Sequence, residues 1–107
     1  MLETLKKLFG FSAAPAVDFK TLVAQGAILV DVRSQAEFAG GHIKGAINIP
    51  LDSLEANLHK LKDKQKPIIT HCASGRRSGI AKGILASKGY AQVYNGGGWQ
   101  GLKAKLS

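Results

Sequence analysis

The segment from Thr70 to Gly79, THCASGRRSG, holds the only cysteine of the chain, and two serines, two glycines and two adjacent arginines follow that cysteine within seven residues. A thiol reacts as its thiolate, and with an unperturbed pKa of about 8.5 only a few per cent of it is ionised at neutral pH. Hydrogen-bond donors and positive charge beside the sulfur favour the thiolate. This composition therefore predicts that Cys72 is a nucleophile that handles an anion.

The place of Cys72 between a strand and a helix strengthens this prediction. The apolar residues 67–69 precede it, and residues 77–88 have the apolar spacing of a helix. The first-turn N–H groups and the dipole of such a helix attract negative charge, and the small residues at 73–75 let successive backbone amides curl inward as an anion-binding nest. A single cysteine excludes an internal disulfide and a cysteine-rich metal site. Whatever Cys72 accepts must therefore leave to another molecule.

The rest of the sequence alternates strand-like and helix-like segments. Apolar runs rich in β-branched residues predict strands at residues 27–32, 45–50, 67–71 and 91–95. Periodicity and capping signals, such as Asp18 and the pair Ser34 and Glu37, predict helices at 19–25, 35–39, 51–61, 77–88 and 99–106, with a glycine loop at 96–98. This pattern predicts an α/β fold, with a small, mostly parallel sheet of about four to five strands flanked by helices on both faces.

Two further expectations concern how these elements pack. Leu51, Leu54, Leu58 and Leu61 should share one helical face, and Ile80, Ile84 and Leu85 should be buried by the helix after Cys72. In open parallel sheets ligands bind beyond the carboxyl ends of the strands. Asp31, Cys72 and Asn95 each stand at or just past the end of an expected strand. We therefore expect them to lie at one edge of the sheet.

Composition and length predict one ordinary globular domain. The chain has 107 residues, of which 45% are hydrophobic and 21% charged. We place the domain at residues 16–107, after an amphipathic segment at residues 1–15. No apolar run approaches the roughly 20 residues needed to cross a bilayer. Charged residues also interrupt the first residues in a way that argues against a signal peptide. We therefore expect a cytoplasmic protein without a membrane partner.

The net positive charge of the chain comes from the half that carries Cys72. Residues 1–63 contain seven basic and seven acidic residues, whereas residues 64–107 contain eight basic residues and no Asp or Glu, so the second half holds the whole net charge of +8. Such a field raises the local concentration of small anions. The basic residues are dispersed and not interleaved with aromatic ones, which argues against a dedicated nucleic-acid site.

Three blocks of the sequence resemble the rhodanese-type sulfurtransferases. HCASGRRSG is similar to their active-site loop, commonly Cys-x-x-Gly-x-Arg-Ser in bacterial single-domain members, and residues 29–50 and 89–99 are similar to two further blocks of the family in the same order. The resemblance covers about residues 16–103. It departs from the family where Trp99 directly follows two glycines, so we expect the final helix to start early.

The resemblance implies a thiosulfate sulfurtransferase that works without a cofactor or a metal. Cys72 would take a sulfane sulfur from thiosulfate or a similar donor, hold it as a persulfide, and pass it to a thiol, to cyanide or to a sulfur-accepting protein. The implied active-site loop comprises Ala73, Ser74, Gly75, Arg76, Arg77 and Ser78.

The resemblance also implies supporting roles outside the sulfur's immediate loop. Asp31 and Arg33 would hold ion pairs and loop hydrogen bonds, while His42 and His71 would hydrogen-bond backbone near the site. Ser78 would either reach the sulfur or cap the helix.

The two arginines are expected to differ in role. Arg77, at the end of the loop, offers a rigid fork of donors for backbone carbonyls or for the sulfonate end of thiosulfate. Arg76 is expected to face outward, toward an incoming anion.

A second resemblance leaves an alternative open. His71, Cys72, Arg77 and Ser78 also match the tyrosine-phosphatase signature His-Cys-x5-Arg-Ser, except that four residues instead of five separate Cys72 from Arg77. Closing a ring of amides on phosphate needs the longer loop, so the count favours sulfur. A cysteine-dependent phosphatase or arsenate reductase, and a sulfur-carrier or binding module, are the competing hypotheses.

Overall fold

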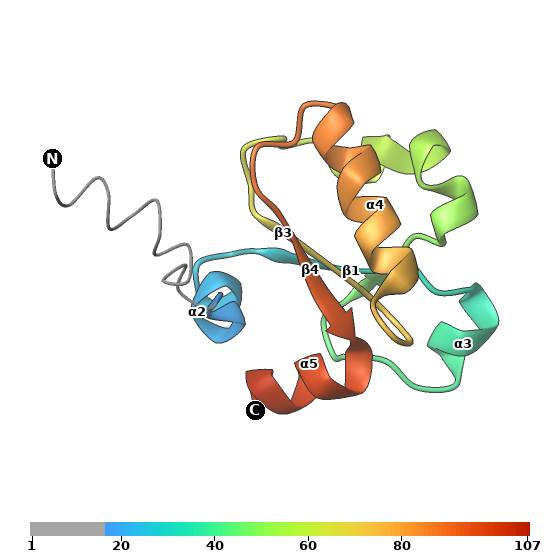
Figure 1. The fold of residues 1–107 in the computed structure, drawn as a ribbon, viewed down its shortest axis with the longest axis vertical. Helices are drawn as coiled ribbons and strands as arrows, with labels where there is room; N and C mark the ends of the chain where they lie inside the picture. Colours follow the sequence, from blue (N-terminus) through green and yellow to red (C-terminus); the bar gives the residue numbers. More distant parts are fainter. Residues whose placement is uncertain (1–16) are drawn as a thin grey trace, which may run out of the picture.

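The computed structural model describes residues 17–107, and a parallel sheet in the strand order β2-β1-β3-β4 forms their centre (Figure 1). The strands are β1 (Ile28–Asp31), β2 (Ile47–Asn48), β3 (Ile68–Cys72) and β4 (Val93–Gly98). All three neighbouring pairs run parallel. The predicted α/β fold and its small parallel sheet are confirmed. The expected amphipathic segment at 1–15 lies outside the described residues.

Helices cover both faces of this sheet. The α-helices are α2 (Phe19–Ala24), α3 (Gln35–Ala39), α4 (Arg76–Ser87) and α5 (Trp99–Leu106), and two 3₁₀ helices are η2 (Leu51–Ser53) and η3 (Glu55–Lys60). The predicted caps are present, because the Asp18 side chain accepts from the Thr21 amide and Ser34 and Glu37 form a reciprocal capping box. In Figure 1, α4 packs on one side of the sheet, while α2 and α5 lie together on the other.

The alternation of side chains along the strands builds two cores. Val30 and Ile68 point to the face covered by α4, where they pack with Leu85. Their neighbours Leu29 and Ile69 point to the opposite face and pack with Leu102 of α5. Successive strand residues face opposite sides, so a strand buried on both faces reads as a continuous apolar run. This is the pattern that predicted β1 and β3.

The segment at 51–61 was wrongly expected to be one α-helix. It forms η2 and η3, and the backbone at Asn57 is not helical, with φ −119° and ψ 23°. The Asn57 side-chain amide donates to the Ser53 carbonyl at 2.8 Å, while its backbone N–H donates to Leu54. The side chain thus takes the acceptor that an α-turn would need. The leucines still meet the core as expected, with Leu54 and Leu61 fully buried.

The glycine run at 96–98 was wrongly expected to be a loop. β4 extends through Gly98, which pairs with Cys72 across a register shift in β3. A Cβ at Gly96 would lie 2.9 Å from Ile69 Cγ2, and one at Gly98 would lie 2.8 Å from the Ala73 carbonyl oxygen. The glycines therefore let β4 run unusually close to its neighbours. α5 follows at once from Trp99, which confirms the expected early start.

The helix after the cysteine differs from the expectation in which residues it buries. α4 starts at Arg76 and buries Ser78, Ala81 and Leu85, which recur on one helical face. Ile84 is partly buried against the same core, but Ile80 is 49% exposed, so its expected burial was wrong. No helix within residues 17–107 is long and apolar enough to cross a membrane.

Candidate active site

The carboxyl edge of the sheet brings the predicted site residues together. Cys72 ends β3 and Asp31 ends β1, and the two strands are direct neighbours. The chain turns after Cys72 through three small residues and enters α4 at Arg76. Asn95 lies within β4, because that strand continues beyond its expected end.

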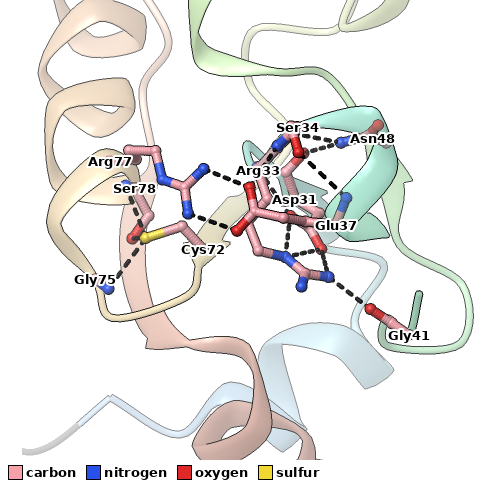
Figure 2. Close-up of polar contacts among 10 residues, drawn as sticks. All are labelled: Asp31, Arg33, Ser34, Glu37, Gly41, Asn48, Cys72, Gly75, Arg77 and Ser78. Atoms are coloured by element: carbon pink, nitrogen blue, oxygen red, sulfur yellow. Dashed lines mark hydrogen bonds and ion pairs between the residues drawn. The ribbon is translucent and has the colours of Figure 1, made fainter. Parts of the chain in front are cut away.

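The loop places several hydrogen-bond partners around the sulfur. The Gly75 N–H donates to Cys72 Sγ at 3.0 Å, the Ser78 N–H donates to it at 3.4 Å, and the Ser78 hydroxyl oxygen lies 3.4 Å away (Figure 2). Gly75 adopts φ +99°, a backbone conformation open mainly to glycine. This turn aims the Gly75 amide back at the sulfur, and the predicted nest of amides is therefore present. Ser78 contacts the sulfur and gives α4 no side-chain cap.

These contacts favour the thiolate of Cys72. Burial raises the pKa of this thiol, but contacts with the Ser78 hydroxyl and with the Ser78, Ser74 and Gly75 amides outweigh it and lower the pKa to about 7. Cys72 itself is only 1% exposed, while Ala73 and Ser74 on the loop above it are exposed. The site thus combines a shielded sulfur with a loop that faces solvent.

The two arginines have different surroundings. Arg77 makes a bidentate pair with Glu37 of α3, at 2.7 and 3.0 Å. Of its two expected partners, the backbone carbonyls are not bound within residues 17–107, and the sulfonate of a donor stays a prediction. The hydrogen bonds from Arg77 are the main reason that the pKa of Glu37 falls to about 2. The pair lies beside Cys72 (Figure 2). Arg76 is exposed, as expected.

A buried ion pair between Asp31 and Arg33 lies at the same carboxyl edge of the sheet. Asp31 is fully buried and accepts three bonds from the Arg33 guanidinium at 2.8 to 3.1 Å, as well as one from the Arg33 N–H. The guanidinium also donates to the Gly41 carbonyl at 2.7 Å and lies over the Trp99 ring. The Asn48 side chain binds the Asp31 and Arg33 carbonyls. The expected ion pair and loop hydrogen bonds of Asp31 and Arg33 are therefore present.

The two histidines expected near the site, His42 and His71, have different surroundings. His42 is exposed, stacks on Phe38 and hydrogen-bonds the Phe38 carbonyl at 2.7 Å, which agrees with its expected contact to backbone. His71 was expected to bind loop backbone, and this was wrong. It is fully buried, its two ring nitrogens have no hydrogen-bond partner, and Nε2 lies 3.6 Å from Asp31. Burial lowers the pKa of His71, although Asp31 opposes this.

Asn95 was expected at this edge but its contacts with the cysteine loop were not foreseen, and Asn48 was missed altogether. Asn95 Oδ1 accepts from the Ser78 hydroxyl at 2.7 Å, and its amide nitrogen donates to the Gly75 carbonyl at 3.1 Å. The position of Asn95 near the end of a strand was the available signal. Nothing in its spacing, however, linked it to a residue of the cysteine loop.

A cavity of about 150 Å³ lies beside the first turn of α4. It is lined by Val32, Ser34, Pro50, Leu51, Asp52 and Arg77. Among residues 17–107, no cluster of three or more His, Cys, Asp or Glu side chains could hold a metal ion.

Comparison with known proteins agrees with this geometry. The family model described as the rhodanese-like domain matches residues 15–105. The chain is 42% identical over 82 residues to the uncharacterized protein YqhL of Bacillus subtilis, covering 72% of this chain and 64% of that protein. It is 40% identical over 70 residues to the thiosulfate sulfurtransferase PspE of Escherichia coli, covering 64% and 67%. Among solved structures, the human single-domain sulfurtransferase TSTD1 has 32% identity and a TM-score of 0.72, covering 88% of this chain and 99% of that one.

Proposed function

Because this chain belongs to the rhodanese-like domain family, we propose that it is a sulfurtransferase in which Cys72 carries the sulfur. The observation that carries the proposal is the set of backbone amides converging on Cys72 Sγ, with the Gly75 N–H at 3.0 Å. The pKa of about 7 makes roughly half of the thiol available as thiolate at neutral pH.

The first half-reaction loads Cys72. The thiolate attacks the outer sulfur of thiosulfate, a new S–S bond forms, and the original S–S bond breaks with its electron pair leaving on sulfite. The products are the Cys72 persulfide anion and sulfite, so that charge and atoms balance. The amides that favour the thiolate also favour the negative charge of the persulfide. The basic half of the chain attracts the doubly charged donor.

The second half-reaction removes the terminal sulfur from the Cys72 persulfide. A thiolate or cyanide attacks the terminal sulfur, the Cys72 thiolate leaves, and the product is a low-molecular-weight persulfide or thiocyanate. Residues 17–107 contain one cysteine, so an acceptor from outside this chain segment has to complete the cycle. The cavity beside Arg77 offers space near the loop for the unreactive part of a donor or acceptor. We propose a small thiol as the acceptor, with action in the cytoplasm.

Mass spectrometry of the intact protein tests this mechanism. Thiosulfate treatment should add one sulfur, about 32 Da, and cyanide should remove it with release of thiocyanate. Cys72→Ser is the matched control and should show no gain. An unmodified native protein after thiosulfate, combined with hydrolysis of an aryl phosphate that Cys72→Ser abolishes, would instead support the phosphatase hypothesis.

A further inference from the structure

The hydroxyl of Ser78 lies between two groups that compete for its single proton. Ser78 is fully buried, and the neighbours of its Oγ are Cys72 Sγ at 3.4 Å and Asn95 Oδ1 at 2.7 Å. A serine hydroxyl donates one hydrogen bond at a time. It can lower the pKa of Cys72 only while its proton points toward the sulfur.

The orientation of the Asn95 amide follows from the backbone around it. Its Oδ1 accepts from the Gly97 N–H at 2.9 Å, and its Nδ2 donates to the Gly75 carbonyl at 3.1 Å. Flipping the amide would place donor against donor and acceptor against acceptor, so the carbonyl oxygen must face Ser78. Gly79 makes room for this side chain, since a Cβ there would lie 3.2 Å from Asn95 Nδ2.

Two oxygens 2.7 Å apart need a proton between them. While Cys72 is a neutral thiol, the Ser78 proton therefore lies toward Asn95, and Ser78 Oγ offers a lone pair to the S–H. When the Cys72 thiol ionises, a hydrogen bond from the Ser78 hydroxyl to the sulfur becomes favourable. Turning the Ser78 proton toward the sulfur, however, leaves Ser78 Oγ and Asn95 Oδ1 in repulsive contact. The thiolate thus gains less from Ser78 than it would with Asn95 removed.

We propose that Asn95 is a positioning residue that competes with the Cys72 sulfur for the Ser78 hydroxyl proton and so sets the acidity of the nucleophile. The proposal rests on the nucleophilic role of Cys72 given above. Asn95 would balance the amount of thiolate against its reactivity, because a thiolate that is stabilised too strongly is a weaker nucleophile even though more of it is present. The backbone amides stabilise the thiolate independently of Asn95, and Asn95 limits what the Ser78 hydroxyl adds.

The test is the pKa of Cys72, measured from the pH dependence of alkylation by iodoacetamide without any sulfur donor. Asn95→Ala should lower this pKa by about one unit, the lower end of what one hydrogen bond to a charged group contributes. Asn95→Asp keeps the acceptor and adds charge, and should raise it. In a Ser78→Ala background, Asn95→Ala should no longer lower the pKa. The other charged and titratable groups near the sulfur, Arg77, Glu37, His71 and Asp31, are unchanged in all these variants.

Asn57→Ala is the matched control, because Asn57 also bonds a backbone carbonyl but belongs to η3. It should leave the pKa unchanged. If Asn95 only braced the loop, its removal would loosen the Gly75 amide and raise the pKa or leave it unaltered, and either result with Asn95→Ala overturns the proposal. Since alkylation involves no sulfur transfer, this outcome is independent of whether thiosulfate is the donor.

Discussion

Gly75→Ala is the substitution that most directly tests how the loop activates Cys72. Gly75 has φ +99°, and an added Cβ would lie 3.3 Å from the Gly97 Cα, which is main chain and cannot turn away. An L-residue pays about 1–2 kcal/mol for a left-handed backbone conformation, and the close contact adds to that cost. We expect a loss of unfolding free energy of about 2 kcal/mol, measured by urea denaturation.

The same substitution should also change the chemistry of the sulfur. Relief of the strain moves the Gly75 N–H, which donates to Cys72 Sγ at 3.0 Å. Loss of one hydrogen bond to a charged acceptor corresponds to about one pKa unit. The pKa of Cys72 should therefore rise from about 7, and the thiolate fraction at pH 7 should fall from about one half to about one tenth. The thiolate that remains is about threefold more nucleophilic, so the alkylation rate at pH 7 falls only about twofold.

The midpoint of the alkylation profile against pH is consequently the better readout. Gly45→Ala is the matched control. Gly45 has a similar φ of +90°, but the Cβ added by this substitution would meet nothing within 4 Å. It should cost stability through the backbone alone and leave the midpoint in place. A Gly75→Ala midpoint that stays near 7, or a Gly45→Ala midpoint that moves equally, would refute the assignment of thiol activation to the Gly75 amide.

Three further substitutions test other parts of the structure. Burial lowers the pKa of His71, so the unfolded chain binds a proton more readily than the native one. The free energy of unfolding should therefore fall as the pH drops below about 6.5. Denaturation series from about pH 7 to 5 should show that His71→Leu flattens this decline. Arg76→Ala should raise the KM for thiosulfate at low salt, because an exposed cation acts through a screened field; a difference that persists near 1 M salt would contradict this. Leu102→Ala should lower the unfolding free energy by about 3 kcal/mol, since Leu102 is buried at 1% exposure, and a loss below about 1 kcal/mol would mean that α5 packs loosely.

The fold was predictable because local patterns and tertiary packing agree in most elements. β1 and β3 are buried on both faces, and their unbroken apolar runs express that burial directly. The caps Asp18 and Ser34 are local hydrogen bonds that sequence spacing encodes. At Asn57, by contrast, one side chain captures a backbone carbonyl, and leucine periodicity does not report that competition.

The site was predictable in its centre and less so in its partners. The amides around Cys72 come from one short segment that follows it, at Gly75 and Ser78, so the small residues and the glycine position specify them. The partner of Arg77 is Glu37, which is forty residues away on another element, and sequence spacing gives no measure of that distance. The contacts of Asn95 with the cysteine loop were missed for a related reason. Its role depends on β4 continuing past it, and the three glycines were taken as the end of the strand.

Those glycines also limit how this site can change. On the β4 side, two close neighbours of the cysteine loop are main chain, with the Gly97 Cα facing Gly75 and Gly98 facing the Ala73 carbonyl, and the Asn95 side chain adds its bonds to Ser78 and Gly75. A point substitution cannot shorten a main-chain neighbour, and a larger residue at Gly98 would collide with the loop, because its Cβ would lie 2.8 Å from the Ala73 carbonyl oxygen. A wider cradle, for a larger anion, would require inserting a residue between Cys72 and Arg77 and moving β4 outward at the same time. We therefore expect this scaffold to resist stepwise evolution toward larger substrates, and engineering of its specificity to succeed by changing loop length before side-chain identity.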